Sequence, residues 1–192
     1  MTKIAWITGS STGIGRALQS LPTDRPRQLG VVGLGAGTLA VYGRPGDEMR
    51  MHEINDQVLD LARRHFSYLG DTPAQVVPVL GDGRRMLERE PPQGFDLLAM
   101  DAFSGDSIPT HLLTLEAFYA YRRHLAPEGW LAVHITNRYL DLRPVMAAAA
   151  QHLGAIGALA KVVPPFLSVA LEGETTTVKF TLLSPQVVVH VP

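Results

Sequence analysis

Residues 29–37, LGVVGLGAG, decide the fold, because a continuous apolar run passes directly into three alternating glycines. Such a run before a glycine turn is typical of a parallel strand that is buried on both faces. The glycines Gly33, Gly35 and Gly37 lack a Cβ, so the turn can bend sharply and its backbone can approach a ligand closely. We therefore predict that residues 29–101 form a Rossmann-like nucleoside-binding half.

Strand and helix patterns alternate along the chain. We expect strands at residues 3–8, 29–34, 49–54, 75–80, 95–100, 130–136, 159–163 and 178–183, and helices at residues 14–21, 57–68, 84–89, 114–125 and 142–153. Alternation of this kind favours βαβ units on a parallel sheet. The expected fold is α/β: a Rossmann-like, doubly wound and mostly parallel sheet with an antiparallel edge strand. Residues 1–28 form a short lead-in in this interpretation, and residues 29–192 form the cofactor-binding domain.

The composition predicts one folded domain and excludes several partners. The 192 residues are 46% hydrophobic and 18% charged, which suits a single core. Lys and Arg number 17 against 18 Asp and Glu, with no basic run, so nucleic acid is not an expected partner. The absence of cysteine fits a reducing compartment, which indicates the cytoplasm. No apolar stretch is long enough to span a membrane, so we expect no membrane partner. The sequence leaves a homodimer open.

Three carboxylates follow successive predicted strands. Glu53 ends the strand after the glycine turn, Asp82 follows residues 75–80, and Asp101 follows residues 95–100. Ligands of open α/β sheets bind outside the carboxyl ends of the strands, where these acids should gather. Glu53 can accept hydrogen bonds from two ribose hydroxyls, and Asp82 can accept from an adenine amino group.

Histidines and aromatic residues give weaker signals. The seven histidines are scattered without metal-ligand spacing, so we expect no metal site. We interpret His134, inside a strand pattern, as a packed and hydrogen-bonded residue. His111 is a surface residue in this interpretation, with contact to substrate as the alternative. The aromatic cluster of Phe118, Tyr119 and Tyr121 lies at helical spacing, which favours core packing over an acceptor pocket.

Four segments together resemble a known family: VVGLGAG (31–37), HEIN (52–55), LGDGR (80–84) and FDLLAMDAFSGDSIPTHLLTLEAF (95–118). Over roughly residues 13–153 the chain looks like the spermidine-synthase-like branch of the class I methyltransferase-fold superfamily. The resemblance implies that the chain binds S-adenosylmethionine or decarboxylated S-adenosylmethionine and transfers an aminopropyl or methyl group to a small-molecule amine. It also implies a site for the adenosyl group made by Gly33, Gly35, Gly37, Glu53, Asp82 and Gly83.

The chain also departs from this family. Aminopropyltransferases carry an Asp-x-x-Asp pair whose second Asp deprotonates the attacking amine, whereas Ser104 stands at that position here. By the resemblance Asp101 would lie beside the reacting groups, and Asp106 could reach the site from its loop, where a carboxylate would attract the amine and accept its proton. We expect the amino-terminal β-hairpin portion of the family to be absent or reduced. A non-catalytic remnant that keeps an adenosine pocket therefore stays an alternative.

A second glycine turn offers a rival interpretation. Residues 3–18, KIAWITGSSTGIGRAL, look like the start of a short-chain dehydrogenase that binds NAD(P). That family needs a Tyr-x-x-x-Lys pair, and none of the three lysines follows a tyrosine by four residues. A single sheet has room for one adenosine at its switch point. We therefore favour the turn at residues 33–37, with an NAD(P)-dependent reductase as the further alternative.

Overall fold

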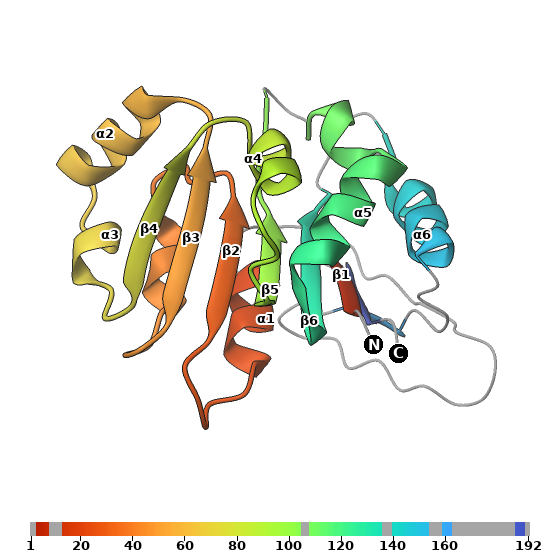
Figure 1. The fold of residues 1–192 in the computed structure, drawn as a ribbon, viewed down its shortest axis with the longest axis horizontal. Helices are drawn as coiled ribbons and strands as arrows, with labels where there is room; N and C mark the ends of the chain where they lie inside the picture. The colour runs from red at the N-terminus through yellow and green to blue at the C-terminus, as the bar shows by residue number, and fades with distance from the viewer. Residues whose placement is uncertain are drawn as a thin grey trace.

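The computed structural model describes residues 3–7, 13–104, 108–135, 140–153, 159–162 and 187–190, and Figure 1 shows their arrangement. The elements in chain order are β1 (Lys3–Ile7), α1 (Gly15–Ser20), β2 (Gln28–Val32), the 3-10 helix η2 (Thr38–Tyr42), β3 (Glu48–Glu53), α2 (Asp56–His65), α3 (Tyr68–Asp71), β4 (Gln75–Leu80), α4 (Gly83–Arg89), β5 (Phe95–Met100), the 3-10 helix η3 (Thr110–Leu113), α5 (Leu115–His124), β6 (Leu125–His134), α6 (Arg143–His152), β7 (Leu159–Val162) and β8 (Val187–His190). None of the helices in these ranges combines the length and the apolar character needed to cross a membrane.

Six strands form one sheet in the order β1-β6-β5-β2-β3-β4, and all of its pairings are parallel. From β2 the chain moves outward through β3 to β4, then returns to the other side of β2 and continues through β5 to β6 (Figure 1). The strand order therefore reverses between β2 and β5, near the centre of the sheet. Ligands bind outside the carboxyl ends of the strands at such a reversal. The fold thus places the turn at residues 33–37, which follows β2, at this position.

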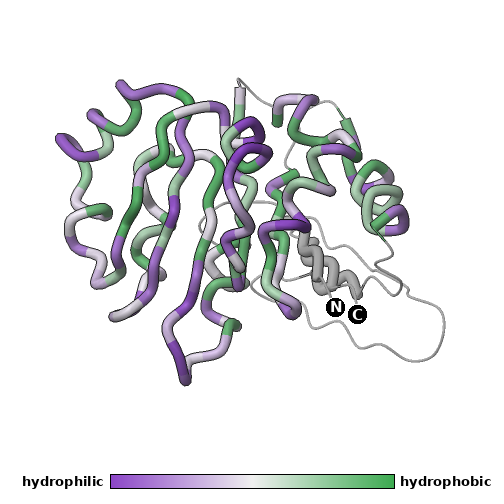
Figure 2. Tube along the Cα trace, in the orientation of Figure 1, coloured by the Kyte–Doolittle hydropathy of each residue, from purple (hydrophilic) through white to green (hydrophobic). Residues whose placement is uncertain are grey.

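Helices cover both faces of the sheet. Neighbouring strand residues point to opposite faces, so Val31 belongs to a buried cluster with α1, η2 and α2, whereas Val32 belongs to a second cluster with α4, α5 and α6. The strand β5 is buried at every position, as its continuous apolar pattern predicts. The outer surface of α4, by contrast, is strongly hydrophilic (Figure 2). The predicted doubly wound α/β fold is confirmed.

The sequence predicts that the antiparallel strands form an edge of the main sheet, but they do not. The strands β7 and β8 pair with each other as a separate two-stranded sheet and not as an edge of the main sheet, although β8 runs beside β1. The physical reason is that β1 already occupies the place next to β6, which it pairs in parallel. The strand expected at residues 178–183 lies outside the described residues.

Two element boundaries also differ. The helix expected at residues 57–68 is divided, because Phe66 adopts an extended backbone and ends α2 before α3 begins. The strand β6 begins at Leu125 and not at Trp130, with a register shift opposite residues 95–97. At Gly129 a Cβ would lie 2.4 Å from the carbonyl oxygen of Phe95, so this glycine permits the close approach of the two strands. The segment at residues 127–129 is therefore part of an irregular strand and not a break before one.

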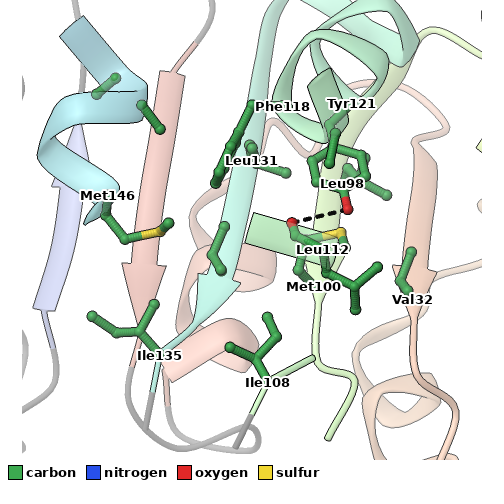
Figure 3. Close-up of a cluster of buried hydrophobic side chains, with 14 of the residues drawn as sticks. Val32, Leu98, Met100, Ile108, Leu112, Phe118, Tyr121, Leu131, Ile135 and Met146 are labelled. Atoms are coloured by element: carbon green, nitrogen blue, oxygen red, sulfur yellow. Dashed lines mark hydrogen bonds between the residues drawn. The ribbon is translucent and has the colours of Figure 1, made fainter. Parts of the chain in front are cut away.

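Two aromatic residues of α5 serve the core. Phe118 and Tyr121 are buried, with their rings edge to face and their centroids 5.8 Å apart. The hydroxyl of Tyr121 donates a hydrogen bond of 3.1 Å to the carbonyl of Leu112 (Figure 3). Burial raises the pKa of Tyr121, so the hydroxyl keeps its proton for this bond. The predicted packing role is confirmed for Phe118 and Tyr121 but is wrong for Tyr119, which lies on the outer side of α5 and is exposed.

A buried ion pair joins the elements on the α1 side. The guanidinium of Arg27 donates to the carboxylate of Asp47 and to the carbonyl oxygens of Leu18 and Tyr42, at 2.7 and 2.8 Å for the two carbonyls. Both charged side chains are 1% exposed. Burial alone would raise the pKa of Asp47, but hydrogen bonds from Arg27 and the backbone of Arg44 outweigh it and lower that pKa. The pair thus links α1, β2, η2 and the turn before β3.

A second polar cluster lies between β3 and the ends of α4 and α5. Alternate residues of β3 are polar (Figure 2). Arg50 forms an ion pair of 3.0 Å with Glu90. The side chain of His52 is fully buried, with its Nε2 3.9 Å from a Glu90 oxygen, and the buried His124 contacts the carbonyl of Leu87 at 2.6 Å. Within the described residues, His52 Nε2 and His124 Nδ1 have no hydrogen-bond partner. Burial lowers the pKa of both histidines.

Candidate functional site

The three glycines of the turn after β2 adopt left-handed backbone conformations. The φ angles are 98° at Gly33, 53° at Gly35 and 80° at Gly37. A Cβ on Gly33 would lie 2.4 Å from the carbonyl oxygen of Asp101, so the turn touches the backbone that follows β5. At Gly35, which is exposed, a Cβ would meet no atom of the described residues within 4 Å, so this part of the turn is open on that side. The turn is therefore packed against the sheet on one side and open on the other.

Glu53, the last residue of β3, is held against this turn. One oxygen of its carboxylate accepts from the backbone N–H of Leu34 at 3.1 Å, and the other accepts from the N–H of Asn55 at 3.0 Å. Each carboxylate oxygen can accept more than one hydrogen bond. The two contacts thus fix the orientation of the carboxylate and leave lone pairs for the hydroxyls of a ligand.

Asp82 begins α4. Its Oδ1 accepts from the backbone N–H of Arg85 at 2.9 Å, which is an N-cap contact, and its Oδ2 lies 3.2 Å from Nε2 of His111. A Cβ on Gly83 would lie 2.5 Å from a methyl carbon of Val32, so the first turn of α4 packs directly on β2. Asp82 thus caps α4 and lies at the carboxyl ends of the sheet strands, where His111 contacts it.

Asp101 and His134 form a pair that the sequence interpretation missed. Met100 and Val133 are register partners on β5 and β6, so the next residue of each strand lies at the same edge of the sheet. Asp101 Oδ1 lies 2.6 Å from His134 Nδ1, and the two side chains are 15% and 12% exposed. The ring of Phe103 stands edge-on to the imidazole, with centroids 4.5 Å apart. The hydrogen-bonded state predicted for His134 is confirmed, but its partner is a candidate catalytic residue.

Two further residues of the predicted site, Ser104 and Asp106, belong to the loop after β5, which the structure describes only in part. Ser104 is exposed at the end of the described loop, and Asp106 lies outside the described residues. Within the described ranges, no three His, Asp or Glu side chains converge in a way that could hold a metal ion.

The described residues on either side of the amino-terminal glycine turn lie away from this site. The strand β1 is the outermost strand of the six-stranded sheet, away from the reversal between β2 and β5. A Cβ on Gly15 would lie 2.2 Å from the ring of Tyr42, so this glycine allows α1 to pack on η2. Residues 8–12 of the turn lie outside the described residues. Its placement after an edge strand does not fit a dinucleotide site, which belongs at the switch point.

The chain is similar to curated polyamine aminopropyltransferases, and no protein-family model matches it. A polyamine aminopropyltransferase of Vibrio vulnificus (strain CMCP6) is 29% identical over 117 residues. The aligned part is 57% of this chain and 38% of that protein. The chain therefore spans less than half the length of this relative.

Solved structures show the same fold. The probable spermidine synthase of Corynebacterium glutamicum ATCC 13032 superposes with a TM-score of 0.64 at 21% identity, over 95% of this chain and 62% of that chain. Human methyltransferase-like protein 13, solved in complex with SAH, gives a TM-score of 0.58 at 20% identity, over 92% of this chain and 74% of that chain. At such identities the likeness is one of fold, and it confirms the class I methyltransferase type. The chain thus has the class I methyltransferase fold and is similar in sequence to a polyamine aminopropyltransferase.

Proposed function

We propose that this chain is a transferase that binds S-adenosylmethionine or its decarboxylated form and moves an aminopropyl or methyl group to a small amine. The proposal depends on one observation above all: the carboxylate of Glu53 is fixed by two backbone N–H groups beside a glycine turn at the strand-order reversal. A carboxylate there can accept from both ribose hydroxyls of an adenosyl group. The similarity to a polyamine aminopropyltransferase and to a methyltransferase-like protein solved with SAH supports the same donor.

The residues around Glu53 fit an adenosyl group. Gly35 is exposed, and a Cβ there would meet no atom of the described residues, so the backbone of the turn can approach the ligand without a side chain between them. Asp82 keeps one oxygen near His111, and this oxygen is the candidate acceptor for the adenine amino group. Asp101 lies against Gly33, on the side where the reacting end of the donor would extend. These roles assign Gly33, Gly35, Gly37, Glu53, Asp82 and Gly83 to donor binding.

The chain would contribute mainly orientation. A sulfonium donor supplies an electrophilic carbon when it is bound, so the protein needs to hold the amine in line with that carbon and to remove a proton from the nitrogen. The carboxylates Asp82 and Asp101 make this edge of the sheet negative, which attracts a cationic amine. A small polyamine or a related primary amine is therefore the acceptor class that the site fits.

Calorimetric titration of the 192-residue chain with S-adenosylmethionine, its decarboxylated form and 5′-methylthioadenosine tests the proposal. We expect saturable binding of at least one of the three. The variant Glu53→Gln replaces one carboxylate oxygen with an amide and should weaken that binding about 10- to 100-fold, the usual loss for a hydrogen bond to a charged group. Glu48→Gln makes the same change at the opposite end of β3 and should bind as the wild type does. If none of the three compounds binds, or if Glu53→Gln binds like wild type, the proposed site is wrong.

Product analysis separates the two group transfers. The chain is incubated with putrescine and one of the two donors. Transfer of an aminopropyl group from decarboxylated S-adenosylmethionine should release 5′-methylthioadenosine. Transfer of a methyl group from S-adenosylmethionine should release S-adenosylhomocysteine. The non-catalytic remnant predicts neither product. The reductase alternative predicts stabilisation by NADPH, but the edge position of β1 and the tight packing at Gly15 disfavour it.

A further inference from the structure

His111 contacts the carboxylate that the proposed function assigns to the adenine. Its Nε2 lies 3.2 Å from Oδ2 of Asp82, and the two side chains are 50% and 23% exposed. A carboxylate accepts hydrogen bonds and does not donate them, so Nε2 of His111 is the donor in this contact. The other oxygen, Oδ1, accepts from the backbone N–H of Arg85 at 2.9 Å. Each oxygen of Asp82 is thus held by a donor, as each oxygen of Glu53 is.

The backbone of His111 is attached to two helices. The guanidinium of Arg84 on α4 donates to the carbonyl of His111 at 2.7 Å, and an ion pair of 2.7 Å with Glu88 holds that guanidinium. At the next residue of η3, the buried Leu112, the carbonyl accepts from the hydroxyl of Tyr121 on α5. The imidazole of His111 therefore extends from a fixed backbone toward Asp82.

The contact between His111 and Asp82 lies next to the carboxylate proposed for the ribose. Glu53 and Leu80 are register partners at the ends of β3 and β4. The backbone N–H of Gly81 donates to the carbonyl of Glu53 at 2.9 Å, and Asp82 is the following residue. Neighbouring strands are about 4.8 Å apart. An adenosyl group whose ribose binds Glu53 would therefore have its base beside Asp82.

We propose that His111 is the positioning residue that makes this site specific for adenine, an inference that rests on the proposed function. Its Nε2 occupies one lone pair of Asp82 Oδ2 and fixes the carboxylate, so that the second lone pair accepts from the 6-amino group of the base. A purine with a 6-oxo group has no hydrogen to donate there and would face the carboxylate with its own lone pairs. The contact between His111 and Asp82 thus distinguishes an amino from an oxo group at this position of the base.

Calorimetric titration with 5′-methylthioadenosine and with 5′-methylthioinosine, its 6-oxo analogue, tests the inference on the 192-residue chain. We expect the wild type to prefer the adenosine compound at least about 10-fold, the usual effect of a hydrogen bond to a charged group. His111→Ala releases Oδ2 of Asp82 and should lower this preference about 3- to 10-fold, mainly by weaker binding of 5′-methylthioadenosine. His65→Ala, on the exposed end of α2, is the matched control and should keep the wild-type preference.

Three further variants separate a positioning role from a purely structural one. His111→Gln should restore most of the preference, because its amide nitrogen can donate from about the place of Nε2. Asp82→Asn can present an amide NH₂ to the base and should shift the preference toward 5′-methylthioinosine. Arg84→Met removes the donor to the carbonyl of His111 and should lower the preference less than His111→Ala does. A structural histidine would weaken both compounds equally and leave their ratio unchanged.

The outcomes for the inference and for the proposed function are distinct. Failure of the wild-type chain to bind any adenosyl compound would contradict the proposed function. Wild-type binding of the two nucleosides with equal affinity would contradict only the specificity for adenine. A wild-type preference in His111→Ala, or an equal loss of both compounds in His111→Ala and His111→Gln, would overturn the role of His111. Tighter binding of 5′-methylthioadenosine by His111→Ala would also overturn it, because His111 would then compete with the adenine for Asp82.

Discussion

At the scale of single residues, the sequence predicts at which edge of the sheet the candidate binding acids lie, but not which side chains they contact. Glu53 and Asp101 could be assigned to one edge because each follows a strand whose apolar pattern is unambiguous. The pairing of Asp101 with His134 could not be assigned, because it depends on β5 and β6 being neighbours and on their register. A histidine at the end of a predicted strand, with an acid at the end of another, is the signal that could have found it.

The glycine turn yields a prediction at the same scale. Gly33→Ala should lower the free energy of unfolding by about 3 kcal/mol, because a left-handed backbone is unfavourable for alanine and the new Cβ would overlap the carbonyl of Asp101. In Gly35→Ala the new Cβ overlaps no described atom, so only the left-handed backbone is unfavourable. The free energy of unfolding should therefore fall by about 1 kcal/mol. Urea unfolding measures both. Equal losses in the two variants would mean that the packing of Gly33 against Asp101 is not tight.

At the scale of elements, the sequence predicts the central strands and helices and misses short or irregular ones. The strands β4 and β5 begin and end at the predicted residues. The 3-10 helices η2 and η3 were not expected, since segments of four or five residues carry too little periodicity to detect. The early start of β6 was hidden by its proline and glycine, which normally indicate a turn.

The buried ion pair between Arg27 and Asp47 gives a prediction at this scale. Arg27→Met should destabilise the chain by about 3–5 kcal/mol, because it leaves the Asp47 carboxylate buried without its partner and frees two carbonyl oxygens. Chemical denaturation measures the loss. Arg64→Met is the control: its pair with Asp60 is exposed on α2, and its removal should cost less than about 1 kcal/mol. A loss as small for Arg27→Met would show that the pair does not hold these elements together.

At the scale of the whole molecule, the polar cluster of His52, His124, Arg50 and Glu90 makes stability depend on pH. Burial lowers the pKa of both histidines in the folded chain, so the unfolded chain binds more protons below its own histidine pKa of about 6.5. Stability should therefore be greatest above about pH 7 and fall as the pH decreases from 7 to 5.

The thermal midpoint, measured between pH 8 and pH 5, tests this expectation. His124→Gln keeps a donor for the carbonyl of Leu87 but cannot be protonated, so the fall in Tm over this range should be smaller than in wild type. His152→Gln, on the exposed end of α6, should show the wild-type dependence. A His124→Gln profile that matches wild type would show that His124 does not contribute to the pH dependence.

Because β1 pairs with β6, the sheet is not completed in the order in which its strands are synthesised. Lys3 is the register partner of Trp130, so β1 leaves the ribosome well before β6, its neighbour in the six-stranded sheet. The strands β2, β3 and β4 can associate while translation continues, since each lies beside the next. Until β6 is synthesised, the apolar strand β1 lacks this partner, and an unpaired apolar strand is a ready site for misassociation or chaperone binding.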